Sequence, residues 1–433
     1  MRIDLTRTWP RTFFLAAVVA CGGILLYFSG KAYLATRWSD SSRPELWRRA
    51  AQIEPGNATY WARLGIFRQW NAGPGGDREA INYLARATRV DPYASDLWME
   101  LADAYQTSGN SDGAQRAYKK AQENFPMSAE VAWRYGNFLL FQEKLTEGYL
   151  EIRRAISIDP SLTQSALVEC WRADPNVTSI LDHVLPGETE YYVGAIDFFL
   201  AQHLLDPALA VWDRQGKLGL AINVPETIAL SDALIGKDRF AEAQRTWNQG
   251  LAATKFSSGS RNSGSSLVFN GGFESDIANG GFDWREVAIA GAQFDSDTAM
   301  AYSGSLSLRV RFDGTANLNF QNLFQYVPVE PASRYHFSAY LRTENISTDR
   351  GIRFEILDPR HPSQLQIVTL EIRGTNPWTL VQADLATGPD THLLKITLQR
   401  IPSWKFDNKL SGTVWVDGVA IMPIPEPVMD KSG

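Results

Sequence analysis

Proline recurs at a nearly constant interval through the first half of this chain. The residues are Pro55, Pro92, Pro126 and Pro160, which lie 37, 34 and 34 residues apart. Each follows a segment with helical periodicity, and proline cannot continue a helix. A period near 34 residues with helix-turn-helix content predicts an array of helical repeats. Such arrays bind other proteins along an extended surface.

The unit between Pro92 and Pro126 shows the pattern most clearly. Its apolar and small residues follow the i, i+3, i+4, i+7 spacing of one helix face in two successive segments. They are Trp98, Leu101, Ala102 and Tyr105 in the first segment, and Ala114, Tyr118 and Ala121 in the second. Gly109 and Asn110 supply the turn. We expect Ala102 and Ala114 to lie where the two helices cross.

The same positions recur on both sides of this unit. They are Trp61, Leu64, Gly65, Ala80 and Ala87 before it, and Tyr135, Gly136 and Ala155 after it. Over residues 58–160 the pattern resembles the tetratricopeptide repeat, from which it departs at Arg68 and Gly148. The resemblance implies an all-α superhelix that holds a protein partner. Residues 38–55 read as a leading half unit and 161–255 as decayed units, so we predict helical repeats over 37–256.

Aromatic residues also occur at the first-helix positions of these units. We expect them mostly to serve the core, and the polar positions between them to face the partner. These aromatic residues are Tyr60, Trp61, Trp98, Trp133 and Tyr135.

An apolar run occupies residues 13–28, FFLAAVVACGGILLYF, with Arg2, Arg7 and Arg11 ahead of it. At 1.5 Å per residue it spans about 24 Å, close to the ~30 Å hydrocarbon core of a bilayer. The preceding basic residues favour a cytoplasmic amino terminus. We therefore predict a stub and single-pass signal anchor over 1–36, in a bacterial inner membrane, with the bulk of the chain in the periplasm. A cleaved secretory signal and a lipoprotein modified at Cys21 are the alternatives.

Composition narrows the functional class. The net charge of −6 argues against nucleic acid, which attracts basic surfaces. The cysteines are Cys21, in the apolar run, and Cys170, so no disulfide is expected in the soluble part. No GxSxG, GK[ST] or HExxH motif occurs, and we predict a protein without enzymatic activity. The alternative is a polysaccharide-active enzyme that uses the carboxylates Glu355 and Asp358.

Helical periodicity ends at a Ser/Gly-rich segment over 257–266, which predicts a flexible linker that lets the two ends act semi-independently. Segments with a period of two follow, separated by turn residues. They cover residues 305–312, 335–342, 352–357, 365–372, 393–399 and 413–421. This pattern predicts an antiparallel β-sandwich over 267–424 and a short tail over 425–433.

Two short motifs mark the ends of this domain: Asn270-Gly271-Gly272-Phe273-Glu274 opens it, and Val414-Trp415-Val416-Asp417-Gly418-Val419 lies near its end. With Trp284 and the segment 304–310 they resemble carbohydrate-binding modules of the galactose-binding-like jelly-roll class. The resemblance implies polysaccharide binding on one sheet face and a structural calcium ion. By position, Glu274 and Asp417 would hold the calcium, for which carboxylate oxygens are suitable ligands.

Sugar rings stack on aromatic side chains while polar groups fix their hydroxyls. The predicted stacking residues are Trp284, Tyr340, Trp378 and Trp404, and the predicted polar partners are Arg342 and Arg400. Trp404 lies in a loop and is the best candidate for exposure. No strand shows an aromatic platform on one face, so a protein-binding or spacer sandwich is a second interpretation.

The sequence thus predicts a membrane-anchored, non-enzymatic scaffold of the bacterial envelope. Its repeats would bind a protein partner and its sandwich would bind glycan. The protein would act in exopolysaccharide assembly or export. The alternative scaffold is a protein-assembly factor whose sandwich binds no sugar.

Overall fold

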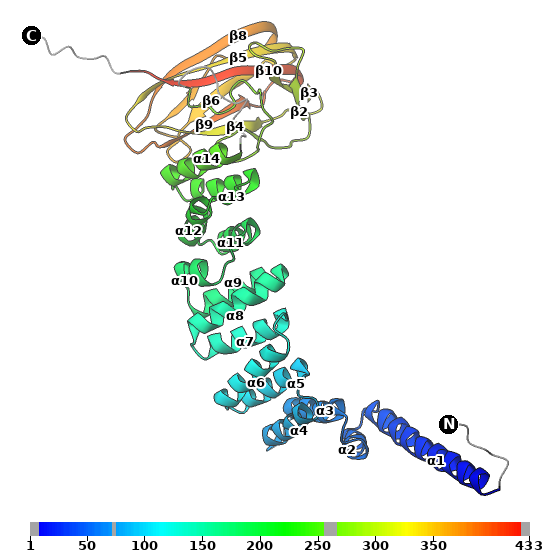
Figure 1. Ribbon diagram of the computed structural model, residues 1–433. Helices are drawn as coiled ribbons and strands as arrows, with labels where there is room; N and C mark the ends of the chain where they lie inside the picture. The colour runs from blue at the N-terminus through cyan, green and yellow to red at the C-terminus, as the bar shows by residue number, and fades with distance from the viewer. Residues whose placement is uncertain (1–7, 72–74, 255–265, 426–433) are drawn as a thin grey trace, which may run out of the picture. The chain divides into compact units, whose positions relative to one another are not determined.

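The computed structural model describes residues 8–71, 75–254 and 266–425 (Figure 1). The chain divides into two compact units, residues 1–186 and 187–433, each of which is described by itself. Arg2, Arg7, the linker expected at 257–266 except Ser266, and the tail at 425–433 except Pro425 lie outside the described residues.

The first unit is helical. Its elements are α1 (Thr8–Ser39), α2 (Pro44–Ile53), α3 (Ala58–Trp70), α4 (Gly76–Val90), α5 (Ser95–Thr107), α6 (Ser111–Asn124), α7 (Ala129–Phe141), α8 (Leu145–Ile158), a 3-10 turn (Pro160–Leu162), α9 (Thr163–Ala173) and α10 (Val177–His183). Helices α2, α4, α6 and α8 each end two residues before one of the periodic prolines. The proline interval therefore predicted these four helix ends correctly.

Side-chain caps begin several of these helices. The Asn57 side chain accepts a hydrogen bond from the Thr59 N–H, that of Asn110 from the Gly113 N–H, and that of Ser128 from the Val131 N–H. Each cap satisfies a backbone donor that the first turn leaves unpaired.

Small residues lie where the paired helices cross. Ala102 and Ala114 are both fully buried between α5 and α6. A Cβ atom on Gly65 would lie 2.5 Å from Cγ of Leu84, and α3 could not then approach α4 so closely. The crossing geometry predicted from residue size is confirmed.

The second unit begins with α11 (Thr189–Ala201), α12 (Leu205–Lys217), α13 (Val224–Ile235) and α14 (Phe240–Thr254). Leu230 and Leu234 on α13 and Ala243 and Trp247 on α14 are buried. Gly250 on α14 faces Thr227, whose Cγ2 would lie 2.2 Å from an added Cβ. The interpretation of this region as further helical pairs is confirmed for α13 and α14.

The rest of the second unit is the predicted all-β sandwich. Its strands are β1 (Arg285–Glu286), β2 (Ala292–Asp297), β3 (Ser307–Asp313), β4 (Phe320–Pro328), β5 (Arg334–Ile346), β6 (Arg353–Leu357), β7 (Gln366–Val368), β8 (Gly374–Ala386), β9 (Leu393–Arg400) and β10 (Ser411–Pro423). One antiparallel sheet has the order β1-β4-β9-β6-β7 and the other β2-β3-β10-β5-β8. Strands β1, β2, β4 and β8 were not predicted.

Alternate residues of both sheets form one apolar core. It includes Val327 on β4, Phe354 on β6, Phe337 on β5 and Val416 on β10. The intervening residues face away from the core, and on the first sheet many of them are polar.

The sandwich packs directly on α13 and α14. Gly280 and Gly281 lie against Ile228 and Trp247, where an added Cβ would meet side-chain carbons at 2.2 Å. The Trp247 ring makes an edge contact with that of Phe282 at a centroid distance of 6.3 Å. The Ser/Gly composition predicted that the helical and sandwich ends of the chain act semi-independently, and these contacts differ from that prediction. The composition of the linker carries no information about the surfaces on either side of it.

Candidate binding sites

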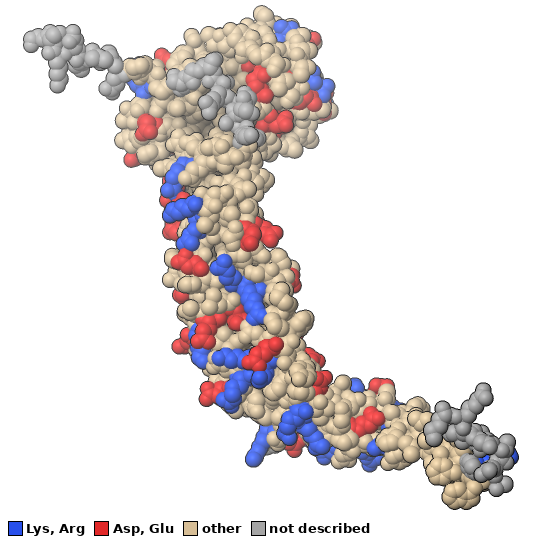
Figure 2. All heavy atoms as spheres, viewed as in Figure 1, with Lys and Arg blue, Asp and Glu red and all other residues tan. Residues whose placement is uncertain are grey.

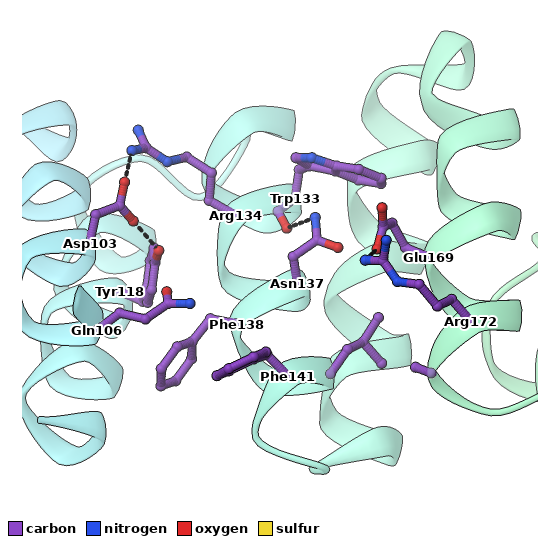
Figure 3. A pocket seen from close by; sticks show the side chains of 12 residues that line it. Asp103, Gln106, Tyr118, Trp133, Arg134, Asn137, Phe138, Phe141, Glu169 and Arg172 are labelled. Atoms are coloured by element: carbon purple, nitrogen blue, oxygen red, sulfur yellow. Dashed lines mark hydrogen bonds and ion pairs between the residues drawn. The ribbon is translucent and has the colours of Figure 1, made fainter. Parts of the chain in front are cut away.

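A pocket of about 510 Å³ opens between α5, α7 and α9 in the first unit (Figure 3). Residues of all three helices line it because the first helices of successive units lie side by side. The lining includes Asp103, Gln106, Trp133, Arg134, Asn137, Phe138, Phe141, Glu169 and Arg172.

One wall is a hydrogen-bonded charge network. The Arg134 guanidinium pairs with Asp103 and lies 3.3 Å from Oε1 of Glu100. The Tyr118 hydroxyl donates to Asp103. Burial raises the pKa of Tyr118, and the negative charge of Asp103 raises it further, so this hydroxyl stays protonated and donates. The network sets two carboxylates around one guanidinium, so this wall keeps a net negative charge while its hydrogen bonds hold the side chains in fixed positions.

Helix α7, which lies between α5 and α9, presents aromatic surface to the pocket (Figure 3). Trp133 is half-buried, and Phe141 is 73% exposed. Asn137 lies between them in the lining, its amide donating to the Trp133 carbonyl at 3.0 Å. The expectation that the first-helix aromatics mostly serve the core holds for Tyr60, Trp61 and Tyr135, whereas Trp133 lines the pocket. Figure 2 shows basic and acidic side chains interspersed over the helices on the face in view.

The six predicted glycan-binding residues do not lie together. Trp284 is fully buried, and its indole N–H donates to the Asn270 carbonyl. Arg400 is also fully buried, with Nη1 2.7 Å from Oδ1 of Asn317 and 2.6 Å from the Leu318 carbonyl. The prediction that Trp284 and Arg400 contact sugar is wrong, because neither side chain is exposed to solvent. Trp284 fills the core and Arg400 fixes the neighbouring loops.

Three of the predicted residues share the outer face of the second sheet. Tyr340 stacks on Tyr302 at a centroid distance of 3.5 Å, and Trp378 meets the edge of Tyr302 at 6.0 Å. The Arg342 guanidinium lies over Trp415, 5.8 Å from its centroid. Trp404 lies elsewhere, in the loop after β9, and is 95% exposed as predicted.

We call the outer face of the first sheet the β4-β9 face. Sequence patterns did not predict it as a binding surface. Registers place its residues in two rows: Arg285, Phe324, Thr397, Glu355 and Val368 in one, and Tyr326, Lys395, Leu357 and Gln366 in the other. The Gln366 amide donates to Glu355 at 2.7 Å, and Nε of Arg353 donates to Gln399 at 2.9 Å. The face therefore combines aromatic rings with hydrogen-bonding groups, the two components of a sugar site.

Comparisons with known proteins agree with this architecture. The family model of the tetratricopeptide repeat matches residues 78–134. The chain carries tetratricopeptide repeats. A repeat-containing protein of Dictyostelium discoideum is 29% identical over 143 residues, 32% of this chain and 51% of the relative. The chain thus spans about half the length of that curated relative.

Solved structures resemble the two parts of the chain separately. A family 4 carbohydrate-binding module is 16% identical with a TM-score of 0.27, and a family 16 module is 18% identical with a TM-score of 0.26. Each match covers 36% of this chain and 99% of the module. The yeast Tom70 structure is 14% identical with a TM-score of 0.28, over 53% of this chain and 47% of that one.

Beyond the tetratricopeptide repeats, the two predicted calcium ligands hold a loop. Glu274 accepts from the N–H groups of Ser305 and Leu306 and from the Ser305 hydroxyl, at 2.7–3.0 Å. Asp417 accepts from the N–H groups of Tyr302 and Ser303. Burial raises the pKa of Asp417, and the charge of Glu274 adds to the rise. Among the described residues no group of three potential metal-ligating side chains occurs, and the calcium ion stays a prediction.

The carboxylates considered for catalysis lie in different environments. Both are buried, but Glu355 accepts from Gln366 on the β4-β9 face, whereas Asp358 accepts from Thr391 and from the backbone of Arg360. Burial would raise the pKa of Asp358, but these hydrogen bonds lower it below its usual value. Asp358 therefore anchors a loop through its hydrogen bonds to Arg360 and Thr391.

Ahead of the repeats, α1 has the length and composition of a membrane-crossing helix. The segment Arg11–Ser39 has a mean hydropathy of 2.1 in its most apolar window, none of which is buried. A signal sequence near an amino terminus has the same properties.

Proposed function

We propose that this protein is a membrane-anchored, non-enzymatic scaffold that binds a segment of a partner protein in the pocket between α5, α7 and α9. The observation that carries the proposal is the aromatic surface of Trp133 and Phe141 on α7, beside a wall whose side chains are held by ion pairs and hydrogen bonds. Exposed aromatic side chains in a pocket are the usual anchors of a protein interface.

A photo-crosslinking amino acid at Asn137 tests this proposal in the full-length chain. We expect a discrete crosslinked partner in cells, which disappears when Trp133 is also replaced by Ala. The matched control places the crosslinker at Lys119, which is exposed on α6 and does not line the pocket. A crosslinking pattern that is the same from both positions would reject the pocket as the site.

The second part of the proposal concerns the sandwich, which binds glycan across the β4-β9 face. Phe324 and Tyr326 supply ring surface, Gln366 and Arg353 supply hydrogen-bonding groups beside it, and the buried Glu355 holds Gln366 in place. Retention of the full-length chain on immobilised polysaccharides tests it. Tyr326→Ala should abolish retention, whereas Trp404→Ala, which alters a distant loop, should not.

The third part concerns location. Helix α1 spans a bacterial inner membrane, with the repeats and sandwich in the periplasm, where the protein serves exopolysaccharide assembly or export. The exposed apolar surface of α1 and the basic Arg11 before the run support this orientation. A periplasm-dependent reporter fused after Gly433 should be active. Activity only of a cytoplasm-dependent reporter would reverse the topology.

A further inference from the structure

A second pocket, of about 420 Å³, lies within the second unit where α13 meets the sandwich. We call it the junction pocket. Its lining residues are Asp232, Ile235 and Gly236 from α13, and Arg285, Tyr326, Pro359, Arg360 and Leu393 from the sandwich. Its volume is in the usual ligand-site range of about 300–1,000 Å³. Tyr326 makes the pocket continuous with the β4-β9 face.

The pocket has donor capacity that the protein does not use. Nη2 of Arg285 is bonded to Asp232 at 2.6 Å and to the Gly281 carbonyl at 2.8 Å. Nη1 of the same guanidinium is buried and has no hydrogen-bond partner among the described residues. An unpaired buried donor is costly, and a ligand acceptor would remove that cost.

A second cation lies beside Arg285. The Lys395 Nζ sits 4.2 Å from the centroid of Phe324, and the Arg285 guanidinium lies 5.8 Å from the same centroid. Lys395 forms no ion pair within 4 Å with a described carboxylate; burial lowers its pKa, the charge of Glu355 on the same face raises it, and the charge of Arg285 lowers it. Two cations that flank one ring repel each other, and a bound anion would turn this repulsion into attraction.

The walls of the pocket also indicate what kind of molecule the anionic group belongs to. The Tyr326 ring has Arg285 over it at 4.9 Å, and Ile235 and Leu393 complete an apolar side. The hydrogen-bonding groups of Gln366, which the buried Glu355 orients, and Arg353 follow along the same sheet face. A ring with an apolar face, several hydroxyl groups and one negative charge matches the apolar side, the hydrogen-bonding groups and the two cations.

We propose that an anionic saccharide, a sugar ring that carries a carboxylate, binds across the junction pocket and the adjoining β4-β9 face. Its carboxylate lies near Arg285 in the pocket and Lys395 on the face, and one ring face lies on Tyr326. The inference rests on the glycan-binding part of the proposed function and names its substrate class. It also makes α13 part of the sugar site, through Asp232 and Ile235.

Calorimetric titration of the full-length chain in neutral detergent tests the proposal. The probes are oligogalacturonate and the same oligosaccharide with its carboxylates methyl-esterified, which keeps the ring and removes the charge. We expect the acid to bind at least tenfold more tightly than the ester, and the preference to shrink as salt rises. Lys395→Gln should remove most of the preference, whereas Lys409→Gln, a change at an exposed lysine, should preserve it.

Other results separate the possible failures. Equal binding of acid and ester would overturn the anionic preference and leave a neutral glycan site. Binding of neither would overturn the inference, whereas retention on immobilised polysaccharides would still decide the glycan proposal. A third result is that inorganic phosphate competes fully with oligogalacturonate, while Tyr326→Ala leaves the affinity for oligogalacturonate unchanged. That result would indicate a simple anion site and would also overturn the inference.

Discussion

Oδ1 of Asp232 on α13 lies 2.6 Å from Nη2 of Arg285 on β1, and the same oxygen accepts from the Gly281 N–H at 2.8 Å. A single carboxylate thus binds the last helical pair to a strand and to the loop before it. The Arg285 side chain is only 13% exposed and that of Asp232 39%. The pair is therefore screened less than a surface ion pair.

Asp232→Ala should weaken the attachment of the sandwich to the helices. It leaves a largely buried guanidinium without its carboxylate, which costs about 3–5 kcal/mol for a fully buried pair. Because Asp232 is partly exposed, we expect a smaller loss of unfolding free energy, about 1–3 kcal/mol. Urea denaturation measures it. Asp206→Ala, which removes an 85% exposed partner of Arg239, should cost less than about 0.5 kcal/mol. Equal losses would contradict the assignment.

Gly65→Ala should destabilise the repeats. The added methyl would overlap Leu84 and force α3 away from α4, so we expect a loss of about 1–3 kcal/mol in unfolding free energy. Gly216→Ala on α12 is the matched control, since no atom lies within 4 Å of the place that its added methyl would occupy. That change should leave stability unaltered or raise it by up to about 1 kcal/mol. Thermal denaturation of both variants decides whether close helix approach requires glycine at residue 65.

Asp283 should make the stability of the sandwich depend on pH. It is fully buried, and burial raises its pKa to about 7 although the N–H groups of Ala278 and Trp284 donate to it. The folded state therefore holds its proton over a range in which the unfolded state has lost it. This contribution is complete below about pH 4 and is lost as pH rises through 7, with a slope of at most about 1.4 kcal/mol per pH unit.

Unfolding free energies at pH 5, 6, 7 and 8 test this slope. Asp283→Asn should flatten it, since the amide does not titrate, whereas Asp407→Asn at an exposed position should not. A slope that persists unchanged in the Asp283 variant would assign the pH dependence to other groups.

Chelation tests the predicted calcium site. All four carboxylate oxygens of Glu274 and Asp417 already accept hydrogen bonds from the 302–306 loop or from Gly418. We therefore expect excess EDTA to leave the melting temperature unchanged, and Glu274→Ala to lower it. A fall in melting temperature with EDTA that added calcium reverses would show that a cation joins these acids.

Sequence patterns predicted the features that depend on local geometry. The prolines gave the ends of four helices, and residue size identified Ala102 and Ala114 as crossing points. Period-two segments predicted six strands of the sandwich. The short β1 has too few residues for such a pattern, and Pro377 obscures it in β8.

The candidate sites depended on long-range register, which one sequence does not reveal. Trp284 and Arg400 are residue types that often bind sugar, but burial decides their role, and both are fully buried. The β4-β9 face requires Tyr326, Lys395 and Gln366 to be neighbours across three strand pairings. The aromatic and β-branched residues over 320–328, Phe320, Phe324, Tyr326 and Val327, were the available signal that an additional strand lies there.

The close fit of Gly280 and Gly281 against Ile228 and Trp247 also bears on how such a chain can evolve. Domains joined only by a tether can be exchanged between genes without loss. Here a sandwich acquired from another gene would not fit the surface of α13 and α14. If the sandwich were lost, Trp247 on α14 would be exposed to water. The junction therefore favours the joint inheritance of both halves, with substitutions on one side selected together with those on the other.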